Sequence, residues 1–352
     1  MNNNITITGE EFSIKRYYED SLKTGAEILT IGYSEQNRPI NVLKKGSGEI
    51  KVLFVARIHG SEPATTDALL KFFTENTFDD IEVYGIFLAN PDGAALYEQL
   101  WLKKPEPYWE NSHIDARANS NQVDINRDWL NLSQKETQAI QNFLIELKPH
   151  FVADHHEYYW SDKGYPPKLP TDDEDGFMAT MTDAHFKWTN EFVKNISEET
   201  MNYLLEKLSK DLDSIKLRHF LGEPIGDYEN PIFLGIYLAL RGFPKLLVET
   251  WGVACSTYRL EKRIEFHKKA MGYVIEWLRN NKSKILSKPE TKETVQFNIK
   301  DFDQNKVKNF LDKLCLHKIK YEIFNDENII VSCSTLEVGF IKTIYYLLIE
   351  KE

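Results

Sequence analysis

The sequence predicts an α/β protein: a mostly parallel, mixed and twisted sheet with helices on both faces, followed by a small C-terminal α/β domain. Short runs of β-branched and other apolar residues alternate with longer helical stretches through most of the chain, which is the pattern of βαβ units. A polar stretch rich in Lys, Ser, Pro and Glu then precedes a shorter β-α-β-β-α pattern. We therefore expect a main domain over 1–283, a linker over 284–293 and a small domain over 294–352.

Each expected element has its own signal. Apolar runs predict strands in the main domain at 28–33, 39–44, 51–57, 81–88, 150–154 and 245–250, and apolar spacing predicts helices at 10–24, 63–76, 133–147, 198–212 and 260–280. Pro63 and the Ser133–Glu136 capping box predict two helix starts, and Asn90-Pro91-Asp92-Gly93 predicts a turn that ends the 81–88 strand. The small domain has expected strands at 294–299, 319–324 and 327–333, and expected helices at 304–316 and 335–350.

The composition argues against two classes of protein. The 352 residues carry a net charge of -11, whereas nonspecific nucleic-acid binding needs a basic face. No apolar run reaches the roughly 18 to 20 residues that a membrane-spanning helix needs. The N-terminus shows no secretory signal, and Cys255, Cys315 and Cys333 are widely spaced, so we expect a cytoplasmic protein with reduced thiols. The oligomeric state stays open.

A candidate metal site begins at the turn after the 51–57 strand, where His59-Gly60-Ser61-Glu62 precedes the predicted helix. Imidazole and carboxylate are common zinc ligands, and the flanking strand and helix hold the backbone of the turn. A third ligand is expected at another strand end, which 150–157 supplies. There His155 and His156 face opposite ways if the extended backbone continues, so one of them is the ligand and Asp154 or Glu157 orients it.

Two further segments carry groups suited to catalysis. Glu249 follows an apolar strand and precedes Trp251, so burial is expected to raise its pKa toward neutrality, as suits a general base acting on water. In the segment from 117 to 129, Arg127 can bind a carboxylate with two hydrogen bonds and Asn126 can add another. Arg117 is a second cation, which can stabilise an oxyanion.

Together these segments resemble the M14 family of zinc carboxypeptidases. The family pattern of HxxE, NPDG, RxNxxGVDxNR, a strand ending in a ligand histidine and a strand ending in glutamate matches in order and spacing over about 25–280. The matching residues are His59 to Glu62, Asn90 to Gly93, Arg117 to Arg127, Asp154 to Glu157, and Val248 to Thr250. The resemblance implies a zinc carboxypeptidase-like fold and makes 1–283 the catalytic domain.

The resemblance also implies a role for each matched residue. His59, Glu62 and His156 bind one zinc ion, with His155 in the place of the usual leucine, and Glu249 takes a proton from water and passes it to the leaving amine. Arg117 holds the oxyanion, while Asn126 and Arg127 hold the terminal carboxylate of a peptide substrate. The tyrosine that closes over the substrate aligns with Tyr228, or alternatively with Tyr237, and Gln122 replaces a common glycine.

The substrate is less defined by the sequence. Leu234, Ile236 and Leu247 suggest a pocket for an uncharged side chain, although Arg241 keeps an acidic one possible. The preferred function is a zinc metallocarboxypeptidase that acts on peptides. The alternatives are a zinc amidohydrolase acting on N-acyl amino acids, similar to succinylglutamate desuccinylase or aspartoacylase, and an inactive binding module of M14 type.

Overall fold

The computed structural model describes residues 9–105, 116–158, 177–211, 215–219, 230–253, 255–289, 291–324 and 327–350. Within them, an eight-stranded mixed sheet has the order β1-β2-β4-β3-β5-β8-β6-β7. The parallel centre is formed by the β3–β4, β3–β5 and β5–β8 pairs. The strands are β1 (Glu27–Tyr33), β2 (Pro39–Gly46), β3 (Ile50–Ala56), β4 (Ile81–Ile86), β5 (Phe151–Tyr158), β6 (Phe177–Thr182), β7 (Ile215–His219) and β8 (Lys245–Trp251).

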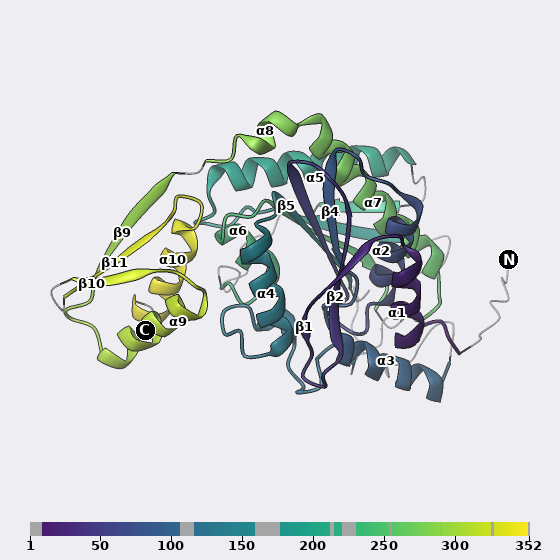
Figure 1. Cartoon of the computed structure of the whole chain (residues 1–352), viewed down its shortest axis with the longest axis horizontal. Coiled ribbons are helices and arrows are strands. Elements are labelled where there is room, and N and C mark those ends of the chain that lie inside the picture. The colour runs from purple at the N-terminus through teal and green to yellow at the C-terminus, as the bar shows by residue number, and fades with distance from the viewer. Residues whose placement is uncertain are drawn as a thin grey trace.

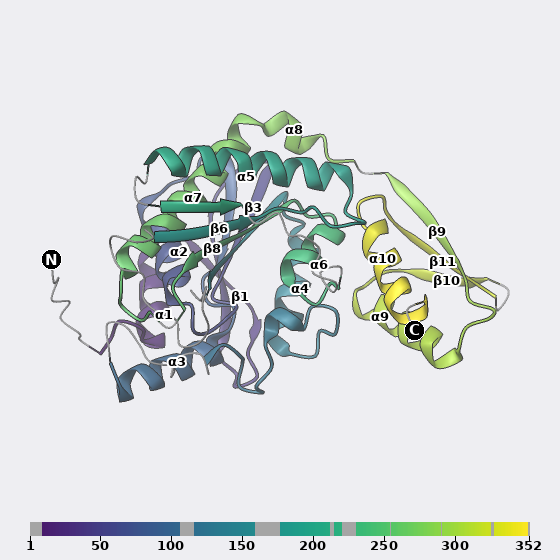
Figure 2. The same cartoon turned by 180° about the vertical axis from the view of Figure 1, so that it is seen from behind.

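Helices cover both faces of this sheet, as predicted (Figures 1 and 2). The helices are α1 (Ile14–Lys23), α2 (Pro63–Glu75), α3 (Pro91–Lys103), α4 (Lys135–Leu147), α5 (Glu191–Asp211), α6 (Leu234–Leu240), α7 (Leu260–Asn280) and α8 (Lys282–Leu286). Apolar side chains of α2, α5 and α7 form one hydrophobic core with one face of the sheet. The other face packs with α4 and α6 in a second core. No helix in the described part of the chain is long and apolar enough to span a membrane.

Several local predictions differ from the structure; for example, the helix expected over 198–212 begins at Glu191. Asn90 does not start a simple turn: its side chain accepts a hydrogen bond from Gly93 N at 2.8 Å and begins α3, with Pro91 in the first turn. The Ser133–Glu136 capping box does not form, because the Ser133 hydroxyl donates to Asp128 at 2.6 Å and Gln134 precedes α4 without a side-chain cap. Strand β5 continues to Tyr158, four residues beyond its predicted end.

The C-terminal part has the predicted β-α-β-β-α order and forms a second sheet of order β10-β11-β9 within the described residues. We call residues 292–350 the C-terminal unit. Its elements are β9 (Lys292–Asn298), α9 (Gln304–Leu316), β10 (Tyr321–Phe324), β11 (Asn328–Ser334), α10 (Val338–Tyr345) and the π-helical turn η3 (Tyr346–Glu350). Figure 1 shows this unit beside α6 and α4, and its apolar residues belong to the same core as theirs.

Candidate functional site

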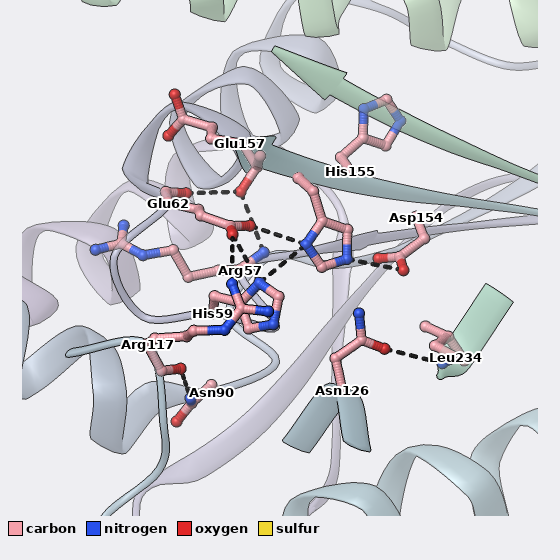
Figure 3. Close-up of polar contacts among 12 residues, drawn as sticks. Arg57, His59, Glu62, Asn90, Arg117, Asn126, Asp154, His155, Glu157 and Leu234 are labelled. Carbon is pink, nitrogen blue, oxygen red and sulfur yellow. Dashed lines mark hydrogen bonds and ion pairs between the residues drawn. The ribbon is translucent and has the colours of Figure 1, made fainter. Parts of the chain in front are cut away.

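Three predicted metal ligands come together at the end of the parallel strands. His59 and Glu62 lie in the turn between β3 and α2, and His156 lies on β5. One ligand atom of each lies within 4.8 Å of the others, and all three residues are buried. The Nδ1 atoms of the two histidines are 3.2 Å apart, and Glu62 approaches them at 2.6 Å and 2.9 Å (Figure 3).

A second carboxylate contacts each imidazole on the side away from Glu62. His59 Nε2 lies 3.2 Å from Asp124 Oδ1, and His156 Nε2 lies 2.9 Å from Asp154 Oδ2. An ionised carboxylate only accepts hydrogen bonds, so each Nε2 can donate to its outer carboxylate, while each Nδ1 faces Glu62 on the inner side of the cluster. Two imidazoles and a carboxylate, with outer carboxylates that orient the rings, are a donor set that fits Zn²⁺, which would bind the imidazoles in their neutral form.

The charges of the site support one another. Burial favours the neutral form of Glu62, but His59 and His156 outweigh it and hold the pKa of this carboxyl well below its ordinary value. Burial disfavours the charged form of His156, yet Asp154 and Glu62 raise the pKa of this imidazole above its ordinary value. The site therefore concentrates negative charge around the two histidines, as a cation site requires.

The two adjacent histidines of β5 point to opposite faces of the sheet. His155 Nδ1 lies 3.0 Å from His267 Nδ1 on α7, on the face opposite to Glu62. The structure therefore brings His156, and not His155, to the metal-ligand cluster. Of the two expected orienting carboxylates, Asp154 contacts His156, whereas Glu157 pairs with Arg263 and accepts from Ala64 N at 3.0 Å.

Glu249 lies beside the metal-ligand cluster on the neighbouring strand. It pairs in register with His156 across the parallel strands β5 and β8, so both side chains emerge on the same face. Glu249 is half-buried. Burial raises the pKa of its carboxyl above the ordinary value. A carboxyl with a raised pKa can accept and return a proton near neutral pH.

Arg117 reaches the same place from the segment that follows α3. Its Nε donates to Asp124 Oδ2 at 2.9 Å, and its Nη1 lies 3.9 Å from Glu62 Oε1 (Figure 3). The Asp124 carboxylate thus contacts His59 with one oxygen and Arg117 with the other. The role of Asp124 as a partner of His59 was missed at the sequence level, although this carboxylate lies inside the quoted RxNxxGVDxNR motif.

Asn126 and Arg127 lie in the short 3-10 turn η2 (Ile125–Arg127). Asn126 Oδ1 accepts a hydrogen bond from Leu234 N at 2.8 Å, which turns the amide nitrogen away from α6 and toward the cluster (Figure 3). The Arg127 guanidinium lies 4.0 Å from the centre of the Phe233 ring and 3.8 Å from Asp124. The structure therefore places these two donors on the same side of the sheet as His59 and Arg117.

Backbone packing brings these segments together. Gly60 N and Asn90 Nδ2 donate to the Arg117 carbonyl at 3.4 Å and 3.3 Å. A Cβ atom on Gly60 would lie 2.1 Å from the Gly93 carbonyl carbon, so only glycine permits this approach. Gln122, where the family commonly has glycine, adopts a φ of 63°, and the loop closes with a hydrogen bond from its backbone N–H to the Asn119 carbonyl.

The predictions about the closing tyrosine and the pocket have mixed outcomes. Tyr228 lies outside the described residues. Tyr237 is 1% exposed and its hydroxyl accepts from Arg241 Nη1 at 2.9 Å, so it is a core residue and not a closing lid.

Arg241 also pairs with Glu337 at 2.9 Å and faces the C-terminal unit, so it does not serve an acidic substrate side chain. Ile236 is buried, whereas Leu247 is half-buried two residues before Glu249.

Comparisons with known proteins agree with this geometry. Residues 17–146 match the zinc carboxypeptidase family, Peptidase M14. A search of curated proteins by sequence gave no match. Among solved structures, the fold is similar to a metallo-carboxypeptidase from Burkholderia cenocepacia, with 13% identity, a TM-score of 0.55, and coverage of 76% of this chain and 68% of that one.

Two more solved structures have the same fold. A metallo-carboxypeptidase from Pseudomonas aeruginosa in complex with (2-guanidinoethylmercapto)succinic acid is 14% identical, with a TM-score of 0.55 and coverage of 77% of this chain and 68% of that one. Bovine thrombin-activatable fibrinolysis inhibitor in complex with tick carboxypeptidase inhibitor is 14% identical, with a TM-score of 0.53 and coverage of 76% and 97%. The zinc carboxypeptidase family M14 thus matches residues 17–146, and the described structure has a carboxypeptidase-like fold with a His-Glu-His cluster that could hold a metal ion.

Proposed function

We propose that the chain is a zinc-dependent carboxypeptidase that hydrolyses the C-terminal amide bond of a peptide with a free terminal carboxylate. The observation that carries this proposal is the convergence of His59, Glu62 and His156, with Glu249 emerging on the same face as His156. The three ligands would hold one zinc ion per chain. When bound there, the ion supplies polarisation of the scissile carbonyl and lowers the pKa of a water molecule.

Glu249 and Arg117 supply the proton transfer and the charge stabilisation in this proposal. The Glu249 carboxylate receives a proton from the attacking water and returns it to the leaving amine, which a raised pKa favours. The Arg117 guanidinium is held near Glu62 by Asp124, where its N–H groups can donate to the oxygen that becomes negative during attack.

Asn126 and Arg127 recognise the terminal carboxylate. Asn126 Oδ1 is engaged by Leu234 N, so its amide N–H groups are directed toward the site, and the guanidinium of Arg127 offers a second set of donors beside it. A guanidinium and an amide can together bind both oxygens of a carboxylate. This recognition would restrict cleavage to the last residue of a chain.

A direct test compares matched peptides that end in a free carboxylate or an amide. We expect the zinc-loaded protein to shorten only the peptide with the free carboxylate, one residue at a time, as read by mass spectrometry. Glu249→Gln should keep its zinc but reduce turnover by at least about 100-fold, because an essential base contributes that much. Glu261→Gln, at an exposed glutamate on α7, is the matched control and should retain wild-type turnover.

A panel of N-acyl amino acids completes the experiment, because they too carry a free carboxylate. If the protein cleaves these compounds and leaves the peptides intact, the amidohydrolase alternative replaces the proposal. Absence of cleavage in both panels, with peptide binding unchanged by Glu249→Gln, would favour the binding module. Wild-type turnover in Glu249→Gln would remove this residue as the base.

A further inference from the structure

Two fully buried residues of the C-terminal unit contact the main domain that carries the metal-ligand cluster. His317 follows the last turn of α9, Phe340 lies on α10, and both have no exposed surface. Phe340 belongs to the same hydrophobic core as Trp129 and Tyr237 of the main body. Burial of an imidazole and a phenyl ring at this junction argues for a fixed contact and not for a loosely tethered module.

A chain of aromatic rings runs from this junction to the segment that carries Asn126 and Arg127. The Tyr237 ring on α6 lies 5.4 Å from Phe340 and 5.6 Å from His317, measured between ring centres. On its other side, Tyr237 lies 5.4 Å from Trp129, which follows η2 by two residues. Each of these distances is within the range of favourable aromatic pairs.

A hydrogen bond makes a second link to the same segment. His317 Nε2 lies 3.1 Å from the Leu130 carbonyl oxygen, and a carbonyl only accepts, so the imidazole donates from Nε2. His317 Nδ1 is buried without a hydrogen-bond partner among the described residues. Leu130 is three residues beyond Arg127, so this contact restrains the backbone directly after Asn126 and Arg127.

Helix α6 holds the turn from the other direction and is itself bound to the C-terminal unit. Asn126 Oδ1 accepts from Leu234 N, and Trp129 N donates to the Ile232 carbonyl at 3.2 Å. At the far end of α6, Arg241 pairs with Glu337 at 2.9 Å and donates to the His317 carbonyl at 3.3 Å. Figure 2 shows α6 between the C-terminal unit and the body of the sheet.

We propose that the C-terminal unit positions the substrate-binding turn: His317 and Phe340 hold the segment from Ile125 to Leu130 so that Asn126 and Arg127 face the substrate carboxylate. His317 and Phe340 are positioning residues, because they reach the substrate site only through Leu130, Tyr237 and Trp129. The proposal rests on the proposed function for the role of Asn126 and Arg127, but the restraint of the turn can be measured independently. Binding groups need to be held within about half an ångström to act efficiently.

The test uses His317→Phe in the full-length, zinc-loaded chain. Phenylalanine keeps a ring in place and removes the donor to Leu130, while His317→Gln restores a donor. We expect amide hydrogen exchange over 125–134 to become at least about fivefold faster in His317→Phe, which is the effect of losing one hydrogen bond, with part of the protection regained in His317→Gln. Exchange over 56–62 and zinc content should stay unchanged.

Activity provides the second readout. KM for a peptide with a free carboxylate should rise about fivefold in His317→Phe while kcat changes little, because a ground-state binding contact is loosened. Phe340→Leu removes the second buried contact and should raise exchange over the same segment. The control is Phe310→Leu, at a buried ring of α9 that packs on Phe297 and Tyr345 within the unit and should leave exchange at 125–134 unchanged.

The possible outcomes separate the two hypotheses. Unchanged exchange over 125–134 in both His317→Phe and Phe340→Leu overturns the proposal, and so does an equal effect of Phe310→Leu. Faster exchange over 125–134 in His317→Phe and Phe340→Leu, but not in Phe310→Leu, supports the proposal. If that exchange is faster while KM stays constant, the turn is positioned as proposed, and the carboxylate-binding role of Asn126 and Arg127 is the part that fails.

Discussion

The division of roles between two adjacent histidines illustrates how strand geometry determines chemistry at the residue scale. His156 contacts Glu62 and Asp154 on one face of the sheet, whereas His155 contacts His267 on the other. Burial lowers the pKa of His155 to about 3, with a further contribution from His156, so this imidazole stays neutral at physiological pH. Because it contacts His267 on the face away from Glu62, His155 packs behind the cluster and is not one of its ligands.

Alanine substitutions of the two histidines should have unequal effects on zinc. We expect His156→Ala to lower zinc affinity by more than the roughly 10- to 100-fold that loss of an outer partner costs, because it removes a direct ligand. His155→Ala should keep a full equivalent of zinc, although its cavity lowers stability. Metal analysis after dialysis against a chelator series measures both variants, and the reverse order of affinities would exchange the two assignments.

At the scale of the element, the turn between β3 and α2 is shaped by a buried arginine. Arg57 has a φ of 62° and no exposed surface. Its Nε donates to the Gly60 carbonyl at 2.8 Å, and its guanidinium lies 5.4 Å from the Tyr17 ring and 5.3 Å from the Tyr97 ring. A left-handed backbone costs about 1–2 kcal/mol for a residue with a side chain, so these contacts offset strain between the strand and the ligands.

Replacing Arg57 by methionine should weaken the metal site. The side chain keeps much of its length but loses the bond to the carbonyl between His59 and Glu62, so we expect the zinc dissociation constant to rise by about 10-fold, as for loss of an outer partner. Competition with a fluorescent chelator measures it. Arg16→Met, on the same Tyr17 ring and paired with Asp67, is the matched control and should leave zinc affinity unchanged while lowering stability. Equal zinc affinity in Arg57→Met and the wild type would contradict the assignment.

On the scale of the whole molecule, the C-terminal unit and the main domain share one hydrophobic core, so the junction contributes to global stability. His317 lies at this junction, against α6 and the segment after η2. Burial lowers the pKa of His317 to about 3, and the nearby charges of Arg241 and Lys313 act in the same direction, whereas its bond to the Leu130 carbonyl opposes them. The folded protein therefore keeps this imidazole neutral at pH values where the unfolded chain protonates it.

This difference predicts how stability depends on pH. Between about pH 6.5 and 3 the unfolded chain binds a proton at His317 that the folded protein does not, so the free energy of unfolding falls as pH falls. By pH 5 the loss from this residue is about 2 kcal/mol. Between pH 7 and pH 5 we expect the free energy of unfolding, as measured with urea, to fall by about 2 kcal/mol less in His317→Phe than in the wild type. The same pH dependence in both proteins would show that His317 does not act in this way.

Much of the fold was predictable because it depends on short-range patterns. The apolar strands, the start of α2 at Pro63 and the full extent of α7 follow from local hydrophobic spacing and proline preference. Errors arose where a tertiary partner competed for a polar side chain. Ser133 donates to Asp128 instead of capping α4, and Glu136 accepts from Asn119 at 3.2 Å. No local rule contains these partners.

By itself, the sequence determined the order of strands and helices and the ligand types, because strand ends of a parallel sheet meet at one edge and bring His59, Glu62 and Glu249 near each other. Only the tertiary structure decided that Asp124 supports His59, that Tyr237 belongs to the core, and that His317 reaches Leu130. His59 and Asp124 are 65 positions apart in the chain, and His317 and Leu130 are 187 positions apart. Their geometry depends on how whole elements pack, and packing is a property of the folded chain and not of any local segment.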